Sequence, residues 1–265
     1  LSFILIFTIN FEIYNNIQFK FFTHDLKNIS YSNILKYKTF NTLFYFNIEL
    51  LHNFNLIYLK TKNVLEFSSS TKPSFLHCLL YKYPYKKFNL KQIYNNKYSY
   101  TDKFDKKLNS LSLLKNILGY TIDKDNNNYI TKNFILENDN KNQDIIYNDL
   151  SVKFIAHFIE NANKQLQFSM FLYAVNHLSK GGHYISNFRL LQTKASADIC
   201  LIGKKLFQDV KLYRIKCQNL FKQSGVFVIF YGFKGISDKY NKELLDIFDR
   251  LYEYDPTGGT IFNVA

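Results

Sequence analysis

Residues 197–232, ADICLIGKKLFQDVKLYRIKCQNLFKQSGVFVIFYG, constrain the fold most, because apolar pattern, charge and turn residues agree there. Residues 197–202, apolar except for Asp198, predict a strand, and residues 226–231, after the helix stop Ser224-Gly225, are typical of a buried strand. At about 100° per residue, the apolar residues between them share one helix face. They are Leu206, Phe207, Val210, Tyr213, Cys217, Leu220 and Phe221. The stretch therefore predicts a strand, a helix and a strand.

The opposite face of this expected helix is cationic. Its basic residues are Lys204, Lys205, Lys211, Arg214, Lys216 and Lys222. The only acid in the helix is Asp209, whereas helices selected for solubility alone usually mix both signs. The face therefore predicts an anionic partner, and Arg189, in a strand expected just before, joins the candidate RNA contacts. The alternative is that these lysines are merely solvated.

The net charge is a better guide to partners than the residue counts. Lys, Asn, Phe, Tyr and Ile have A/T-rich codons, so mutational pressure can enrich them without selection on the protein. Such a genome also supplies Asp and Glu codons, yet the chain has 21 acids against 34 basic residues and a net charge of +13. A positive field of this size suits nucleic acid or an anionic membrane.

Residues 79–107 interleave aromatic and basic side chains, with no acid before Asp102. Aromatic rings can stack on unpaired bases while lysines neutralise phosphates, so the segment has the chemistry of a single-strand or RNA-loop binder. The candidate contacts are Lys82, Lys86, Lys87, Lys91, Lys97, Tyr83 and Tyr85. The alternative is a loop in which two abundant residue types coincide, and Pro84 favours an extended segment at the surface.

An acidic, Asn-rich tract divides the chain. Residues 123–149 carry a net charge of −3, against +10 for residues 1–122 and +6 for residues 150–265. A polar tract of this kind predicts a linker or a long surface loop. We therefore expect a basic, aromatic-rich N-terminal region that contains strands, this linker, and a C-terminal domain of α/β type. The fold class is α+β, with a mixed strand-rich N-terminal half and a helix/strand C-terminal domain.

Weaker patterns place the other elements. Alternating runs predict N-terminal strands at residues 3–9, 17–23, 42–48 and 56–59. Apolar residues at helical spacing predict helices at residues 108–118, 152–162 and 168–178. A strand is expected at residues 184–191, and Ser237-Asp238 is expected to cap a last helix whose Leu244 and Phe248 face inward.

No catalytic motif is complete. Gly203-Lys204 follows an expected strand and opens the expected helix, as a phosphate loop would. However, Asp198 stands where the first glycine belongs and Lys205 where Ser or Thr should bind magnesium. What remains is a helix N-terminus with two lysines that could attract a phosphate. No GxGxxG or GxSxG motif occurs. We expect no enzyme, no cofactor and no small-molecule substrate.

Metal, disulfide and membrane features are lacking in the sequence. Cys78, Cys200 and Cys217 are widely spaced in apolar contexts, which predicts free thiols in a reducing compartment. The six histidines show no metal-ligand spacing, so no metal site is expected. No run is long and apolar enough to cross a bilayer, so no transmembrane segment is expected.

In style, the chain resembles a mitochondrially encoded ribosomal protein of an A/T-rich organelle genome. The resemblance rests on the lysine-rich KKLFQDVKLYRIK, on the tract NNN at residues 126–128, and on aromatic segments such as TLFYFNIELLHNFNLIYL. It implies a structural protein of the mitochondrial matrix, encoded in the organelle. Such a protein would bind rRNA and neighbouring ribosomal proteins, with the small subunit favoured.

Two other classes stay open at this point. A matrix-side accessory subunit of a respiratory-chain or ATP-synthase complex could use the same helices for protein contacts. An organellar RNA-processing enzyme is the third class, although the sequence lacks adjacent carboxylate pairs for metal-dependent cleavage.

Overall fold

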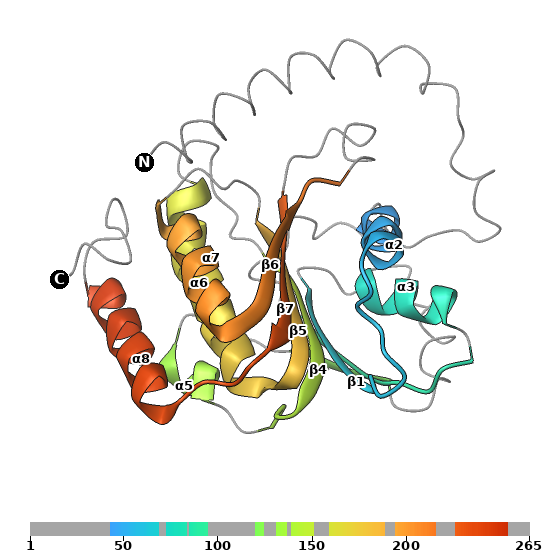
Figure 1. The fold of residues 1–265 in the computed structure, drawn as a ribbon, viewed down its shortest axis with the longest axis horizontal. Coiled ribbons are helices and arrows are strands. Elements are labelled where there is room, and N and C mark those ends of the chain that lie inside the picture. Colours follow the sequence, from blue (N-terminus) through green and yellow to red (C-terminus); the bar gives the residue numbers. More distant parts are fainter. Residues whose placement is uncertain are drawn as a thin grey trace, which may run out of the picture.

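The strands of this chain form one sheet with helices on both faces (Figure 1). The computed structural model describes residues 43–68, 73–83, 85–94, 120–124, 131–136, 139–150, 159–188, 194–215 and 226–253. Within them the sheet has seven strands in the order β3-β2-β1-β4-β5-β7-β6. The strands are β1 Asn63–Ser68, β2 Asn89–Tyr94, β3 Tyr120–Lys124, β4 Gln143–Asp149, β5 Leu178–Phe188, β6 Phe207–Tyr213 and β7 Val226–Phe233.

The sheet is parallel except at one strand. β1 pairs in parallel with both β2 and β4, and β4 pairs in parallel with β5. β7 lies antiparallel between β5 and β6, so β6 runs in the same direction as β5. The mixed sheet with its helices confirms the α+β class expected from the sequence.

The helices form two layers. The described helices are α2 Leu43–Asn53, α3 Phe75–Lys82, α5 Lys132–Leu136, α6 Ile159–His177, α7 Lys194–Leu206 and α8 Asp238–Glu253. Figure 1 shows α2 and α3 on one side of the sheet and α5, α6, α7 and α8 on the other. The first layer packs on residues such as Val64 and Tyr147, and the second on Leu65 and Ile146. Successive strand residues therefore serve opposite layers, as side-chain alternation requires.

The expected order at residues 197–232 is wrong in its first two elements. A helix, α7, takes the place of the first strand, because Ala195, Ile199 and Ile202 recur at helical spacing and are buried. The first residues of the expected basic helix belong to the end of α7, and its next residues form strand β6, which pairs along its length with β7. Pairing with the strongly apolar β7 outweighs the helical spacing of the β6 sequence. The expected strand at residues 226–231 is confirmed by β7.

Gly203 is a packing position and not part of a phosphate loop. It lies inside α7, where a Cβ would come within 2.3 Å of the Phe230 ring on β7. Lys204 and Lys205 lie in the last turn of α7. The C-terminal end of a helix favours cations and disfavours anions. The phosphate site expected at a helix N-terminus here is therefore wrong.

Other expected elements fare unevenly. α2 replaces the strand expected at residues 42–48, and residues 56–59 form no strand. β5 confirms most of the strand expected at residues 184–191, and α6 confirms the helix expected at residues 168–178. The expectations at residues 3–9, 17–23 and 108–118 lie outside the described residues.

The acidic tract contributes to the middle of the sheet. Residues 123–149 contain α5 and β4, and β4 lies between β1 and β5. The tract is therefore not a loop throughout. At the other end of the chain, α8 confirms the last expected helix, and the amide of Tyr240 donates to Ser237 Oγ at 3.3 Å. Among the helices that the structure describes, none has the length and apolar character to span a bilayer.

Candidate functional site

The order of the strands reverses direction at β1 and β4. The chain runs outward from β1 to β2 and β3, then returns to place β4 on the other side of β1. In open sheets of this kind, ligands bind outside the carboxyl ends of the strands at such a switch point. Ser68 and Asp149 are the last residues of β1 and β4 and are register partners. We call this end of the sheet the carboxyl edge and the opposite end the amino edge.

Glu66 is a buried acid on β1 beside the switch point. Its Oε1 accepts hydrogen bonds from the amide of Ser74 at 2.8 Å and from Ser74 Oγ at 3.2 Å. Its Oε2 accepts from the amide of Leu76 at 2.9 Å. Ser74 precedes α3 but makes no side-chain capping bond, so Glu66 caps α3 in its place. The carboxylate thus fixes where α3 begins relative to the carboxyl edge.

Burial sets the titration of this acid. Desolvation raises the pKa of Glu66 to about 7, against the lowering effect of the Leu76, Ser74 and Phe75 amides. The charge of Asp149 raises it further. Burial also raises the pKa of the Tyr147 phenol well above its ordinary value.

A carboxylate–amide pair lies at the ends of β4 and β5. Asn187 Nδ2 donates to Asp149 Oδ1 at 3.1 Å. Both side chains lie on the sheet face that α2 and α3 cover, because they alternate in phase with Tyr147 and Ile185 of that core cluster. The Asn187 Oδ1 atom is buried, and it accepts no hydrogen bond from the part of the chain that the structure describes. The pair brings two acceptor-bearing groups together beside the switch point.

A second polar cluster fixes these strand ends from the α6 side. Asn148 Nδ2 donates to Ser186 Oγ at 3.0 Å and to Tyr184 OH at 3.3 Å. Ser186 Oγ donates to Gln167 Oε1 at 2.9 Å. Gln167 Nε2 donates to the carbonyl of Asn187 at 3.4 Å. Because all four side chains are buried and bonded, the cluster holds the backbone that carries Asp149 and Asn187.

The candidate RNA contacts from the turn between α3 and β2 lie at the amino edge. Lys82 ends α3, where its ammonium donates to the Leu51 carbonyl and lies 5.7 Å from the Tyr83 ring centroid. Lys86 Nζ donates to the Tyr58 and Leu59 carbonyls. Lys87 is exposed, Tyr85 is 97% exposed, and Lys91 is half-buried on β2. This turn therefore presents a basic, aromatic surface away from the switch point.

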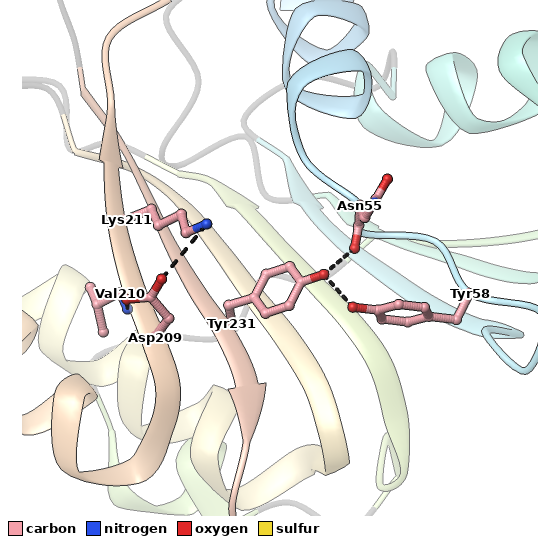
Figure 2. Close-up of polar contacts among 6 residues, drawn as sticks. All are labelled: Asn55, Tyr58, Asp209, Val210, Lys211 and Tyr231. Carbon is pink, nitrogen blue, oxygen red and sulfur yellow. Dashed lines mark hydrogen bonds and ion pairs between the residues drawn. The ribbon is translucent and has the colours of Figure 1, made fainter.

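The candidates from residues 197–232 are separated by the change from helix to strand. Lys204 and Lys205 are exposed at the end of α7, near the amino edge, whereas Arg214 follows β6. Lys211 lies on β6 and forms an ion pair of 3.7 Å with Asp209 (Figure 2). The structure therefore does not place these side chains on one helix face. Lys97, Arg189, Lys216 and Lys222 lie outside the described residues.

Figure 2 shows what Lys211 faces across the sheet. Its ammonium lies 5.9 Å from the ring centroid of Tyr231 on β7. The Tyr231 hydroxyl donates to the Asn55 carbonyl and shares a hydrogen bond with the Tyr58 hydroxyl. Lys211 is thus engaged with an acid and an aromatic ring of its own chain.

Sequence reasoning missed the acids and amides of the carboxyl edge. Glu66 lies within the apolar run VLEFS, which carries no catalytic motif. Asp149 is the last residue of the acidic tract, which was interpreted as a linker because of its charge. The available signal was a short apolar run that ends in polar residues, as in QDIIYND. Short runs of this type are typical of buried parallel strands.

Comparison with known proteins bears on the fold. No protein-family model and no curated protein matches the chain. Among solved structures, it is similar to a ribosomal RNA methyltransferase from Plasmodium falciparum, with a TM-score of 0.52 and 18% identity over 74% of this chain and 99% of that one. This likeness shows the fold.

Two further solved structures show looser likenesses. An S-adenosylmethionine-dependent methyltransferase from Listeria monocytogenes is 12% identical, with a TM-score of 0.43 over 76% of this chain and 62% of that one. The fibrillarin pre-rRNA processing protein of Methanococcus jannaschii is 15% identical, with a TM-score of 0.43 over 71% of this chain and 74% of that one. Neither carries further argument.

The functional expectations drawn from composition are wrong. The chain shares its fold with a protein described as a ribosomal RNA methyltransferase, and this finding contradicts the expected structural ribosomal protein and the alternative of an accessory subunit of a respiratory or ATP-synthase complex. The expectations of no enzyme and of no small-molecule substrate are wrong for the same reason. The error arose because the lysine excess indicates only that a partner is anionic. The strand order that creates a ligand crevice cannot be read from the composition.

Proposed function

We propose that this chain is an S-adenosylmethionine-dependent methyltransferase that acts on RNA. The observation that carries the proposal is the carboxyl edge, where Glu66 and the Asp149–Asn187 pair flank the switch point of a sheet shared with a methyltransferase. A buried acid, a carboxylate and an amide held at the ligand crevice of such a sheet are typical of a site and not of a packing surface.

The charge of these residues fits the methyl donor. S-adenosylmethionine carries a positive sulfonium and a positive ammonium, and carboxylates are the side chains that bind such groups. Asp149 would face the cationic part of the donor, while Glu66 holds the start of α3 in place. The donor supplies an activated methyl group, and the protein supplies binding and orientation.

Two features of the sequence indicate modest affinity for the donor. Residues 69–74 contain no glycine, and no acid lies between Glu66 and Asp102. In nucleotide-binding sheets, glycines after the first strand let the backbone approach the ligand, and an acid further on binds the ribose hydroxyls. This chain would therefore hold the donor with fewer contacts than sites that have both features.

RNA as the methyl acceptor is supported by charge. The net charge of +13 suits a polyanion, and the turn between α3 and β2 presents Tyr85 and Lys87 to solvent. The similar protein from Plasmodium falciparum is described as a ribosomal RNA methyltransferase. An RNA substrate would therefore meet lysines on the surface before one of its nucleotides reaches the carboxyl edge.

Transfer of a labelled methyl group tests the proposal. Purified protein is incubated with methyl-labelled S-adenosylmethionine and with total RNA, DNA or protein, and label is counted in each acceptor. We expect label in RNA, and a loss of about 100-fold or more for Asp149→Ala, because that variant removes the carboxylate at the switch point. Label in protein alone, or equal transfer by Asp149→Ala, contradicts the proposal.

A further inference from the structure

We infer that the substrate is an RNA long enough to be held along the amino edge of the sheet while one of its nucleotides reacts at the carboxyl edge. The inference rests on the proposed function and names the class of substrate. It begins from exposed lysines, one at the amino-edge end of each of six neighbouring strands. They are Lys87 at β2, Lys62 at β1, Lys141 at β4, Lys180 at β5, Lys234 at β7 and Lys205 at β6. We call these six residues the lysine row.

Packing joins the row where β5, β7 and α7 meet. Gly235 follows β7 with a φ of +102°, and a Cβ there would lie 3.2 Å from Lys180 Cε. Glycine thus leaves room for the lysine side chain of the neighbouring strand. Lys234 Nζ donates to the Lys204 carbonyl at the end of α7, at 3.4 Å. The lysines of these three elements therefore lie on one continuous surface.

The same surface continues toward β1 and β2. A Cβ at Gly181 on β5 would lie 3.9 Å from the ammonium of Lys60, which precedes β1. Lys86, which precedes β2, donates to the Leu59 carbonyl at 3.1 Å. The turns before β1 and β2 are therefore held together beside the start of β5. Leu59 is 99% exposed and Tyr85 is 97% exposed, so this end of the surface also carries two projecting apolar side chains.

Acids do not neutralise the row. The ion pairs among the described residues involve Lys132 and Lys211, and none involves the row. Two acids lie beside it in the sequence: Asp139 is exposed, and Asp144 Oδ2 accepts a hydrogen bond from the amide of Lys62 at 2.7 Å. Six lysines against two acids leave a net positive charge at this edge. A bound polyanion would balance that charge.

The dimensions of the row fit a nucleic-acid strand. Neighbouring strands lie about 4.8 Å apart, so six of them span about 24 Å. At about 3.4 Å per nucleotide, that length covers about seven phosphates of a stacked strand. A line of charges matches a line of phosphates, and the fold is shared with a protein described as a ribosomal RNA methyltransferase. These observations favour RNA over an anionic membrane.

The row and the candidate site lie at opposite ends of the strands. β4 runs from Gln143 at the amino edge to Asp149 at the carboxyl edge, a distance of about 20 Å. Helices cover both faces of the sheet, so an RNA must pass around them (Figure 1). The path along the row and to the site is therefore at least about 44 Å, or about 13 stacked nucleotides. An RNA of four nucleotides, about 14 Å long when stacked, is too short to contact both edges.

Methyl transfer to RNA of two lengths tests the inference. Total RNA is partly hydrolysed and separated into a pool of up to about 4 nucleotides and a pool of about 30–50 nucleotides, and intact RNA is kept as a reference. We expect kcat/KM per nucleotide to be at least about tenfold higher for the long pool, because only long RNA gains the contacts to the row. Equal transfer to the two pools overturns this inference and leaves the proposed function standing. No transfer to either pool or to intact RNA overturns both.

Charge reversal tests whether the row makes the contact. Lys180→Glu combined with Lys234→Glu should raise KM for the long pool about tenfold at low salt and leave kcat and transfer to the short pool unchanged. The control, Lys132→Glu combined with Lys211→Glu, changes the net charge equally at lysines that already form ion pairs. It should raise KM by less than about twofold. If both double variants raise KM equally, net charge and not the row retains the RNA, and the inference fails.

Binding gives a readout that does not depend on activity. Filter binding of a labelled RNA from the long pool is measured at several salt concentrations. Lys180→Glu combined with Lys234→Glu should reduce the slope of log affinity against log salt by about 2, and an unchanged slope contradicts the inference. Vesicles of phosphatidylserine and phosphatidylcholine test the rival partner. Binding to these vesicles that depends on the same two lysines and is not displaced by RNA would assign the row to a membrane and overturn the inference.

Discussion

The two edges of the sheet differ in the chemistry they carry. At the carboxyl edge, Glu66 and Asn148 are buried and form several hydrogen bonds each, and Asp149 is bonded to Asn187. At the amino edge, Lys87 is exposed, and Tyr85 is 97% exposed. Buried, bonded polar groups have a fixed geometry, whereas exposed lysines supply charge without a fixed geometry.

This difference assigns separate tasks to the two edges. The carboxyl edge has the preorganised groups that orientation of a reacting atom requires. The amino edge has the charge and the aromatic side chain that attract and retain RNA. Variants at the carboxyl edge should therefore change stability and chemistry, and variants at the amino edge should change only RNA affinity and its salt dependence.

The largest effect is expected at Glu66. Glu66→Ala removes the acceptor of the Ser74 and Leu76 amides, and each buried donor left unpaired costs about 1–3 kcal/mol. We expect the free energy of unfolding in urea to fall by about 3–5 kcal/mol. Glu243→Ala, which removes an exposed acid of α8, should change it by less than about 0.5 kcal/mol. If the two variants lower the free energy of unfolding equally, the buried Glu66 contributes no more to stability than an exposed acid, and the prediction is wrong.

The second effect is a pH dependence from the same carboxyl group. The pKa of Glu66 is raised from 4.5 to about 7 by folding, so the folded protein binds more protons than the unfolded chain between these values. The contribution is complete below pH 4.5 and is lost as the pH rises through 7. Relative to Glu66→Gln, the wild-type protein should lose up to about 3 kcal/mol of stability across this window.

The same comparison isolates Glu66 from the histidines. Burial lowers the pKa of His77 and of His183 to about 4, so their contributions to stability rise with pH in the window where that of Glu66 falls. Both histidines are present in the wild-type protein and in Glu66→Gln, so their contributions cancel in the difference between the two urea midpoints. A difference that does not change between pH 4.5 and 8 would show that Glu66 is not buried as described.

A smaller effect is expected from charge reversal at the amino edge. Lys87→Glu combined with Lys204→Glu should weaken RNA binding about tenfold at low salt and reduce the slope of log affinity against log salt by about 2. Both lysines are exposed, so stability should change by less than about 0.5 kcal/mol. Filter binding at several salt concentrations gives the slope. A lower rate of methyl transfer at saturating RNA would indicate that this edge takes part in the chemistry.

The smallest effect is expected at Lys211. Its charge is partly balanced by Asp209 at 3.7 Å, and exposed ion pairs of this kind contribute little. Lys211→Ala should therefore change RNA affinity by less than about twofold. The matched variant Lys87→Ala removes an exposed lysine that forms no ion pair with any residue in the described ranges, and it should change affinity more. If Lys211→Ala lowers RNA affinity more than Lys87→Ala does, the RNA-binding surface includes β6.

The sequence predicts the fold where packing and local pattern agree. β7 is an unbroken apolar run after a Ser-Gly stop, and α8 combines a serine cap with an inward row of Leu244 and Phe248, so both are predicted near their observed ends. α7 and β6 are predicted in the wrong order, because in this phenylalanine-rich chain the apolar residues fit both the helical and the strand periodicity. Only pairing with β7 decides between them.

The candidate site could not be predicted from local patterns, because its residues come from separate strands. Glu66, Asp149 and Asn187 are brought together by the order of β1, β4 and β5, which no adjacent motif records. The lysines of residues 79–107 and 197–232 were conspicuous because they are contiguous in sequence. Local sequence patterns therefore identify the charged surface, whose residues are contiguous, and miss the candidate site, whose residues are far apart in the sequence.

Binding of S-adenosylmethionine tests the central claim most directly. In a calorimetric titration, we expect the wild-type protein to bind the donor at one site, with binding lost in Asp149→Ala and kept in Lys87→Glu. That result would place the donor at the carboxyl edge of the sheet. If no heat of binding is measured even at donor concentrations well above the dissociation constants usual for methyltransferases, the account is contradicted. Equal binding by Asp149→Ala would also contradict it.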